Sequence, residues 1–341
     1  MIMHSVVKSF RAFFVEGRSL PLLLVLGVII MRLLLFHIEG LPRIVSFGDN
    51  YLWEPIADLF ILPEVSLLGS TFALFLIAWI LSLLNGRFNL TRSRSNLPFS
   101  TPLFLLSIHP IFLVMSGDYI ALIFLLLAFF PLLESFQKPD SYLCSFRASI
   151  LIAIASLFQI YALFVLPLWW IGERSMRGPQ LRSFASSLFA LFLVYVSIFS
   201  LYWLMDDIPR FIRPFLEFQS LSLLEIPRFS LLQWGEILFV GFFFIMNMIF
   251  SVKVYNRDKA LTLSLMQFIS FLIVFLLLLQ MLYWLETFFF LLFSLALISF
   301  LIAYLYSRTN SRNHIFTAYG MLLLMVLFYI SHLFPSIVHF S

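Results

Sequence analysis

The chain has 341 residues, of which 62% are hydrophobic and only 11% are charged. Soluble domains carry roughly 25% charged residues, so this composition excludes a water-soluble globular protein and indicates one that lies in a lipid bilayer. The net charge of +4 is too small to indicate nucleic-acid binding. The single cysteine, Cys144, excludes an intramolecular disulfide and a metal site built from cysteines.

The N-terminal segment is basic and precedes the first long apolar run. Lys8, Arg11 and Arg18 are followed by an apolar run over residues 20–38, which is long enough to span a bilayer. The run ends in Phe-His-Ile-Glu rather than in small residues, which favours an uncleaved signal anchor over a cleavable signal peptide. We therefore expect a cytoplasmic N-terminus.

Two linkers of opposite character flank the second predicted span, residues 66–84. Before it, residues 39–64 carry Asp49 and Glu54 among aromatic side chains and are predicted to be the first extracytoplasmic loop. After it, residues 85–100 hold three arginines and no acidic residue. Positively charged linkers favour the cytoplasmic side, so we expect the second linker there.

The third and fourth predicted spans, residues 98–115 and 119–136, are joined by a three-residue linker and form a tight helical hairpin. Asp118, in this linker, is expected at the outer surface. The next apolar stretch, residues 149–172, is about one span long but is basic on both flanks. We predict that it is a re-entrant pair of short helices interrupted near residues 159–161, because a single crossing would place eight later basic residues outside.

The last apolar runs complete a polytopic bundle. They are expected at residues 184–204, 231–252, 260–280, 284–306 and 315–334. The sequence thus predicts an all-α transmembrane helix bundle with about nine full crossings plus the re-entrant pair, and with the C-terminus outside. It forms a single integral membrane domain, residues 1–341, whose main extracytoplasmic loop is residues 205–230.

The main loop, residues 205–230, contains the candidate substrate-binding residues Arg210, Arg213 and Arg228. Arg210 and Arg213 are three apart, so on a helix they share a face and could hold a phosphate or pyrophosphate by bidentate hydrogen bonds. The alternative is a surface amphipathic helix whose arginines meet lipid headgroups nonspecifically.

The first loop offers Asp49 and Glu54 as candidate catalytic carboxylates, either of which could act as a general base. Isolated carboxylates in interfacial loops also occur simply for solubility. No metal site and no cofactor motif can be read from the chain.

A few ionisable residues fall within the predicted spans, where burial of charge is expensive. His109 and Asp118 are candidate substrate-binding residues and are expected to face the protein interior or an outer cavity. A neutral histidine hydrogen-bonded to a neighbouring helix is the alternative for His109. Arg32 lies about six residues from the outer end of its span, and we expect it to snorkel to the interface.

Two resemblances extend this interpretation. The run Arg147–Phe158 followed by Leu166–Trp170 resembles an uncharacterised family of bacterial multi-pass inner-membrane proteins. In its helix count, its basic linkers and the loop with Arg210 and Arg213, the chain is also similar to O-antigen polymerases and to related GT-C-like glycan transferases that use polyprenyl-linked substrates.

The second resemblance implies an inner-membrane enzyme of lipid-linked glycan assembly, active in lipopolysaccharide biosynthesis. A polyprenyl pyrophosphate would be held by Arg210, Arg213 and Arg228, and a first-loop carboxylate would activate the acceptor hydroxyl. The expected partners are the bilayer and a polyprenyl-linked glycan. A non-catalytic scaffold or accessory subunit with membrane-protein partners, or a transporter, are the alternatives.

Overall fold

A computed structural model describes residues 7–17, 19–42, 50–92, 95–138, 141–219, 231–256, 258–284, 288–308 and 312–333. The regular secondary structure in these ranges is helical, and they contain no β-strand. Seven of the helices described are long and apolar enough to cross a membrane. This confirms the expected all-α, multi-pass architecture, while the number of nine crossings stays a prediction.

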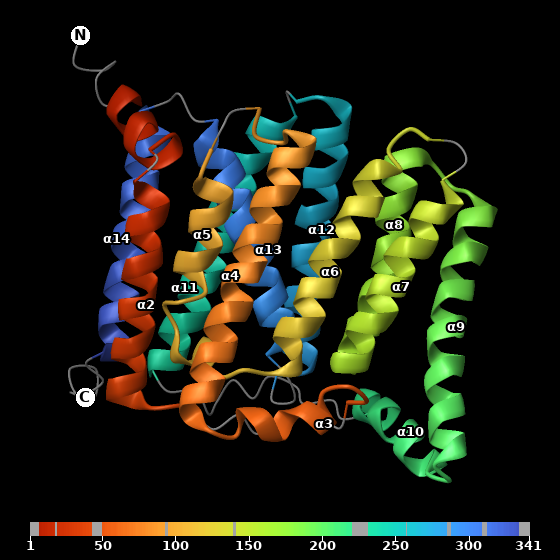
Figure 1. The fold of residues 1–341 in the computed structure, drawn as a ribbon. Coiled ribbons are helices and arrows are strands. Elements are labelled where there is room, and N and C mark those ends of the chain that lie inside the picture. The colour runs from red at the N-terminus through yellow and green to blue at the C-terminus, as the bar shows by residue number, and fades with distance from the viewer. Residues whose placement is uncertain are drawn as a thin grey trace.

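Apart from the short α3 and α10, successive helices from α2 to α14 alternate in direction (Figure 1). Those of membrane-spanning length are α2 (Leu20–Glu39), α4 (Pro63–Phe88), α6 (Gly117–Glu134), α9 (Leu181–Leu204), α12 (Ala260–Leu282), α13 (Phe289–Ser307) and α14 (Arg312–Leu333). Between them lie α5 (Leu97–Leu105), α7 (Tyr142–Phe158), α8 (Val165–Arg177) and α11 (Leu231–Tyr255). Short helices are α3 (Glu54–Ala57) and α10 (Ile208–Leu216), and single turns are η1 (Arg11–Val15), η2 (Asp58–Phe60), η3 (Pro110–Leu113), η4 (Ile160–Phe164) and η5 (Glu217–Gln219).

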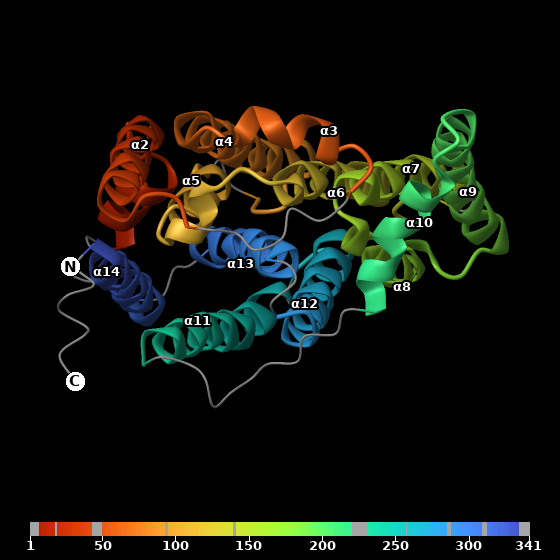
Figure 2. The ribbon, with the colours of Figure 1, turned by 90° about the horizontal axis from the view of Figure 1, so that it is seen from below.

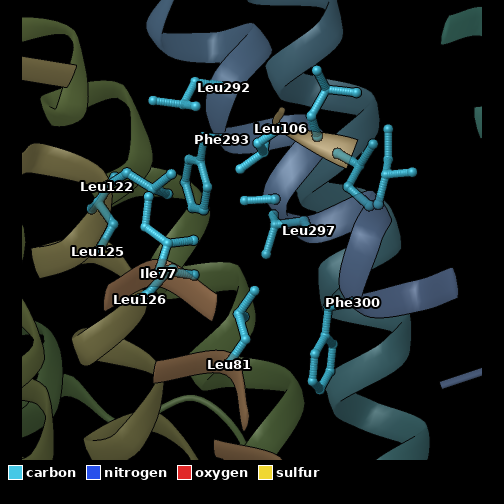
Figure 3. Close-up of a cluster of buried hydrophobic side chains, with 14 of the residues drawn as sticks. Ile77, Leu81, Leu106, Leu122, Leu125, Leu126, Leu292, Phe293, Leu297 and Phe300 are labelled. Atoms are coloured by element: carbon cyan, nitrogen blue, oxygen red, sulfur yellow. The ribbon is translucent and has the colours of Figure 1, made fainter. Parts of the chain in front are cut away.

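Viewed end-on, α2 and α14 lie at one side of the bundle and α9 at the other (Figure 2). α13 lies centrally and 94% of its apolar window is buried, whereas the corresponding share of α9 is only 11%. A helix that is apolar on all sides suits such a central position. Phe293 and Leu297 of α13 pack towards Ile77 of α4 and Leu122 of α6 in the core (Figure 3).

The two ends of the bundle differ in charge. The end at which α2 begins, here the basic end, carries Arg87, Arg92, Lys138, Arg174, Arg177, Arg182, Lys259 and Arg308 at or beside helix ends. The opposite end, here the acidic end, carries Glu39, Glu54, Asp58, Glu64, Asp118, Asp206, Asp207 and Glu217. α3 and α10 also lie at the acidic end (Figure 1).

The third predicted span is only half helical. α5 has nine residues and covers about 13 Å, less than half of the ~30 Å hydrocarbon core. Non-helical backbone at this depth requires hydrogen-bond partners from the protein. Arg32 Nη2 and Tyr119 Oη both donate to the Phe112 carbonyl, at 2.8 and 2.7 Å, and Ser70 Oγ donates to the Leu113 carbonyl at 2.6 Å.

Arg32 therefore does not snorkel, contrary to the expectation from sequence. Its side chain points into the bundle and the residue is 1% exposed. Its Nε donates to Thr71 Oγ1 at 2.8 Å and its Nη2 to Ser70 Oγ at 2.6 Å. The physical reason is that the backbone beyond the end of α5 has carbonyl groups that no helix uses. One of these, the Phe112 carbonyl, accepts a hydrogen bond from the guanidinium inside the protein.

The predicted interruption after residue 158 is present. α7 ends at Phe158, Gln159 adopts an extended conformation, and the chain returns through η4 and α8. Arg177, near the end of α8, donates to Ser141 Oγ at 2.5 Å, so the two helices start and end at the basic end. α7 has 17 residues and covers about 25 Å, which makes the pair longer than the short re-entrant helices that the sequence predicts.

Candidate functional site

The first polar segment is joined to the break between α7 and α8 at the acidic end. Asn50 Oδ1 accepts a hydrogen bond from the Ile160 amide at 2.9 Å, and the Leu52 amide donates to the Leu157 carbonyl at 3.0 Å. These contacts satisfy backbone groups that the end of α7 would otherwise leave unpaired. The segment is thereby fixed against the bundle from residue 50 onward.

Asp118 lies beside this junction, in the first turn of α6, and is 4% exposed. Gln159 Nε2 donates to its Oδ1 atom, and Ser116 Oγ donates to its Oδ2 atom at 3.1 Å. An amide and a hydroxyl therefore hold this carboxylate. The N-terminal end of α6 adds a favourable dipole.

Gly117 permits the close approach of α6 to its neighbours. A Cβ atom at this position would lie 2.4 Å from the Phe158 carbonyl oxygen and 3.1 Å from the Trp53 ring. Trp53 is 1% exposed and stacks on Phe60, with ring centroids 5.6 Å apart. Only glycine fits here without a shift of backbone, so the residue before Asp118 sets the packing of the whole junction.

Glu54 and Arg210 form an ion pair between α3 and α10. Glu54 Oε2 lies 2.8 Å from Arg210 Nη2 and 3.2 Å from Arg210 Nε, so one carboxylate oxygen meets two of the three guanidinium nitrogens. The two side chains are 40% and 44% exposed. The hydrogen bond and the charge of Glu54 raise the pKa of Arg210 above its ordinary value.

Aromatic side chains hold α10 in place. Tyr51 Oη donates to the Phe211 carbonyl at 2.5 Å, and burial raises the pKa of Tyr51 above its ordinary value. Phe211 also packs against Phe199 of α9, with centroids 5.2 Å apart. Asp207 caps the helix by accepting from the Arg210 amide at 3.3 Å. The apolar face of α10 thus lies on the protein and leaves its arginines exposed.

The structure divides the predicted site residues into those at or near the Glu54 and Arg210 pair, those outside the described residues, and His109. The structure brings Glu54 and Arg210 into contact, with Arg213 exposed on the same helix and Asp118 tied to the adjacent junction. Asp49 and Arg228 lie outside the described residues.

His109 lies elsewhere in the bundle. Its ring is 4.6 Å from that of His332 and 6.2 Å from that of Phe328, both on α14. α14 and α10 are on opposite sides of the bundle (Figure 2). His109 is thus packed against a neighbouring helix and does not join the Glu54 and Arg210 pair.

Sequence reasoning missed the part played by Asn50 and Gly117 in the junction. Both adjoin predicted carboxylates, at positions 49 and 118, and that adjacency was the available signal. Gln159 stands out in the sequence as a polar residue within an apolar stretch, but its acceptor is 41 residues away. Nothing in the local pattern identifies that acceptor.

Comparison with known proteins adds no relative: no family model, no curated protein and no solved structure matches this chain.

Proposed function

We propose that this protein is an inner-membrane enzyme of lipid-linked glycan assembly whose site lies at the acidic end of the bundle. The observation that carries the proposal is the Glu54 and Arg210 ion pair, which joins a candidate base to a candidate phosphate-binding arginine. In this proposal the basic end is cytoplasmic, following the positive-inside rule, and the acidic end is extracytoplasmic.

The proposed substrate is a polyprenyl pyrophosphate-linked glycan. Arg210 and Arg213 lie exposed on one short helix beside the ends of the long helices, and the proposal places the pyrophosphate of a lipid-anchored substrate there. Guanidinium groups suit this ligand because their planar fork binds phosphate oxygens bidentately. Arg228 is proposed as a third contact.

The ion pair suggests how phosphate binding by Arg210 is coupled to proton acceptance by Glu54. Arg210 places two of its three guanidinium nitrogens on one oxygen of Glu54. A pyrophosphate carries more negative charge than a single carboxylate and competes for the same guanidinium. Its binding would release Glu54 to accept the proton of an acceptor hydroxyl, as a general base does. Asp49 is the alternative base in this proposal.

Lysine substitution tests the phosphate-binding role. Lys keeps the positive charge but lacks the planar fork, so the R210K/R213K double variant should lose most of its transferase activity. The measurement is the length distribution of the surface glycan by gel electrophoresis, with the membrane level of the protein measured by immunoblot.

The R87K variant is the matched control. Arg87 is an exposed arginine paired with Glu134 at 2.6 Å, but at the basic end. It should leave the glycan unchanged. If R210K/R213K reaches the normal membrane level and the glycan keeps its full length distribution, the transferase proposal is wrong and an accessory subunit takes its place.

A further inference from the structure

A pocket of about 370 Å³ lies between α8 and α9 at the basic end, far from the acidic-end site. Its apolar wall includes Trp170 and Phe184, whose ring centroids are 4.6 Å apart. Trp170 Nε1 donates to Ser187 Oγ at 2.8 Å, which orients the indole. The charged wall is formed by Arg174 and Arg177.

Arg177 lines this pocket, and its terminal nitrogens are engaged within the protein. Its side chain is 1% exposed, and its Nη atoms donate to Glu173 at 2.7 Å and to Ser141. Its Nε atom is buried and has no hydrogen-bond partner. This unpaired N–H of a cation beside the pocket adds to the positive potential there without contacting a ligand. Glu173, the acidic residue lining the pocket, is already engaged by Arg177.

The first turn of α9 adds to the positive potential. Its N-cap residue, Gln180, lines the pocket and makes no side-chain capping hydrogen bond to the helix. The start of a 24-residue helix carries a partial positive charge and amide donors that suit an anion. Arg174, which is exposed at the pocket, contributes a full charge.

An apolar stripe on α9 leads away from the pocket along the bundle. Leu181 and Phe184 line the pocket, and Leu188 and Phe192 continue the stripe at helical spacing. Their exposed fractions run from 40% to 83%. A ligand that places an anionic group in the pocket would therefore lay hydrocarbon along α9.

We propose that this pocket binds the phosphate of an anionic diacyl phospholipid from the leaflet at the basic end. Arg174 and the start of α9 bind the phosphate, the buried Arg177 adds positive potential beside it, and the acyl chains lie along the apolar stripe. The lipid is favoured over a soluble phosphate because the charged wall and the apolar stripe are continuous. The inference does not depend on the activity proposed for the acidic end.

The test is lipid binding to the purified full-length protein in a neutral detergent, measured by isothermal titration calorimetry. Dioctanoyl phosphatidylglycerol is the probe, with dioctanoyl phosphatidylcholine and glycerol 3-phosphate as comparison ligands. Phosphatidylglycerol should bind most tightly, and its affinity should fall about tenfold in R174Q and also fall as salt is raised. R147Q, an exposed arginine on α7 outside the pocket, should bind like the unmodified protein.

Two results would overturn the proposal. Equal affinity for the two lipids, or an unchanged affinity in R174Q, would show that the pocket does not recognise the anionic headgroup. Binding of glycerol 3-phosphate as tight as that of phosphatidylglycerol would assign the pocket to a water-soluble anion.

Discussion

The two ends of the bundle use charged side chains in opposite ways. At the basic end, the Asp258 carboxylate is completely buried and contacts Arg308, Tyr304 and Arg92. At the acidic end, the Glu54 and Arg210 side chains are 40% and 44% exposed. The first arrangement fixes the loop between α11 and α12 against α13, and the second leaves both charges within reach of a ligand.

The difference indicates which charges are available for chemistry. A buried carboxylate between two cations is costly to disturb, because the remaining charges are left without compensation. A half-exposed pair is worth little to stability and can exchange partners. The Asp258 cluster is therefore a structural arrangement, whereas the Glu54 and Arg210 pair can exchange partners, as the proposed function requires.

The substitution with the largest expected effect tests the structural role of the buried Asp258 carboxylate. Asp258→Ala removes the carboxylate that Arg308 and Arg92 share and should lower the free energy of unfolding by about 3 kcal/mol. This is the low end for a buried pair, because 20% of the Arg308 side chain is exposed. The unfolding midpoint of the purified protein in detergent measures it.

Asp58→Ala is the control, because Asp58 is an exposed acid at the opposite end. It should change stability by less than about 0.5 kcal/mol. Equal effects of the two substitutions would contradict the structural role assigned to Asp258.

A second substitution tests the packing beneath the candidate site. Gly117→Ala places a Cβ atom 2.4 Å from the Phe158 carbonyl oxygen and should cost about 1–3 kcal/mol of stability. Gly86→Ala in α4 is the control, because a Cβ atom there meets nothing within 4 Å. It should be neutral or stabilise by up to about 1 kcal/mol. Similar unfolding midpoints for both variants would show that the junction is not tightly packed.

The Glu54→Gln substitution should have little effect on stability and a large effect on glycan transfer. Glu54→Gln removes one charge of an exposed pair and should change the unfolding free energy by less than about 1 kcal/mol. If Glu54 is the general base, the rate of glycan transfer should fall by about 100-fold or more. A membrane-based transfer assay and an unfolding midpoint on the same preparation separate the effect on catalysis from the effect on stability.

Glu64→Gln provides the comparison at the same end, since Glu64 is exposed at the start of α4. It should leave both readouts unchanged. A Glu54→Gln protein that transfers glycan at the normal rate would leave Asp49 as the proposed base.

The direction of the Arg32 side chain could not be predicted from the residues around it in the sequence. Its position near the end of an apolar run predicts snorkelling, and nothing within α2 argues otherwise. The outcome depends on Phe112, which is 80 residues away and whose carbonyl accepts from the guanidinium. That carbonyl is available only because α5 ends at Leu105, and Pro110 makes continuation of the helix unfavourable.

The sequence by itself determined the membrane class, the helical fold, the interruption after Phe158 and the contrast in charge between linkers. These properties follow from composition and from spacing within single segments, since a helix satisfies its own backbone in lipid. Only the tertiary structure decided which polar groups meet. Glu54 and Arg210 are 156 residues apart and Asp118 and Gln159 are 41 apart, so their contacts depend on how the helices pack rather than on any local pattern.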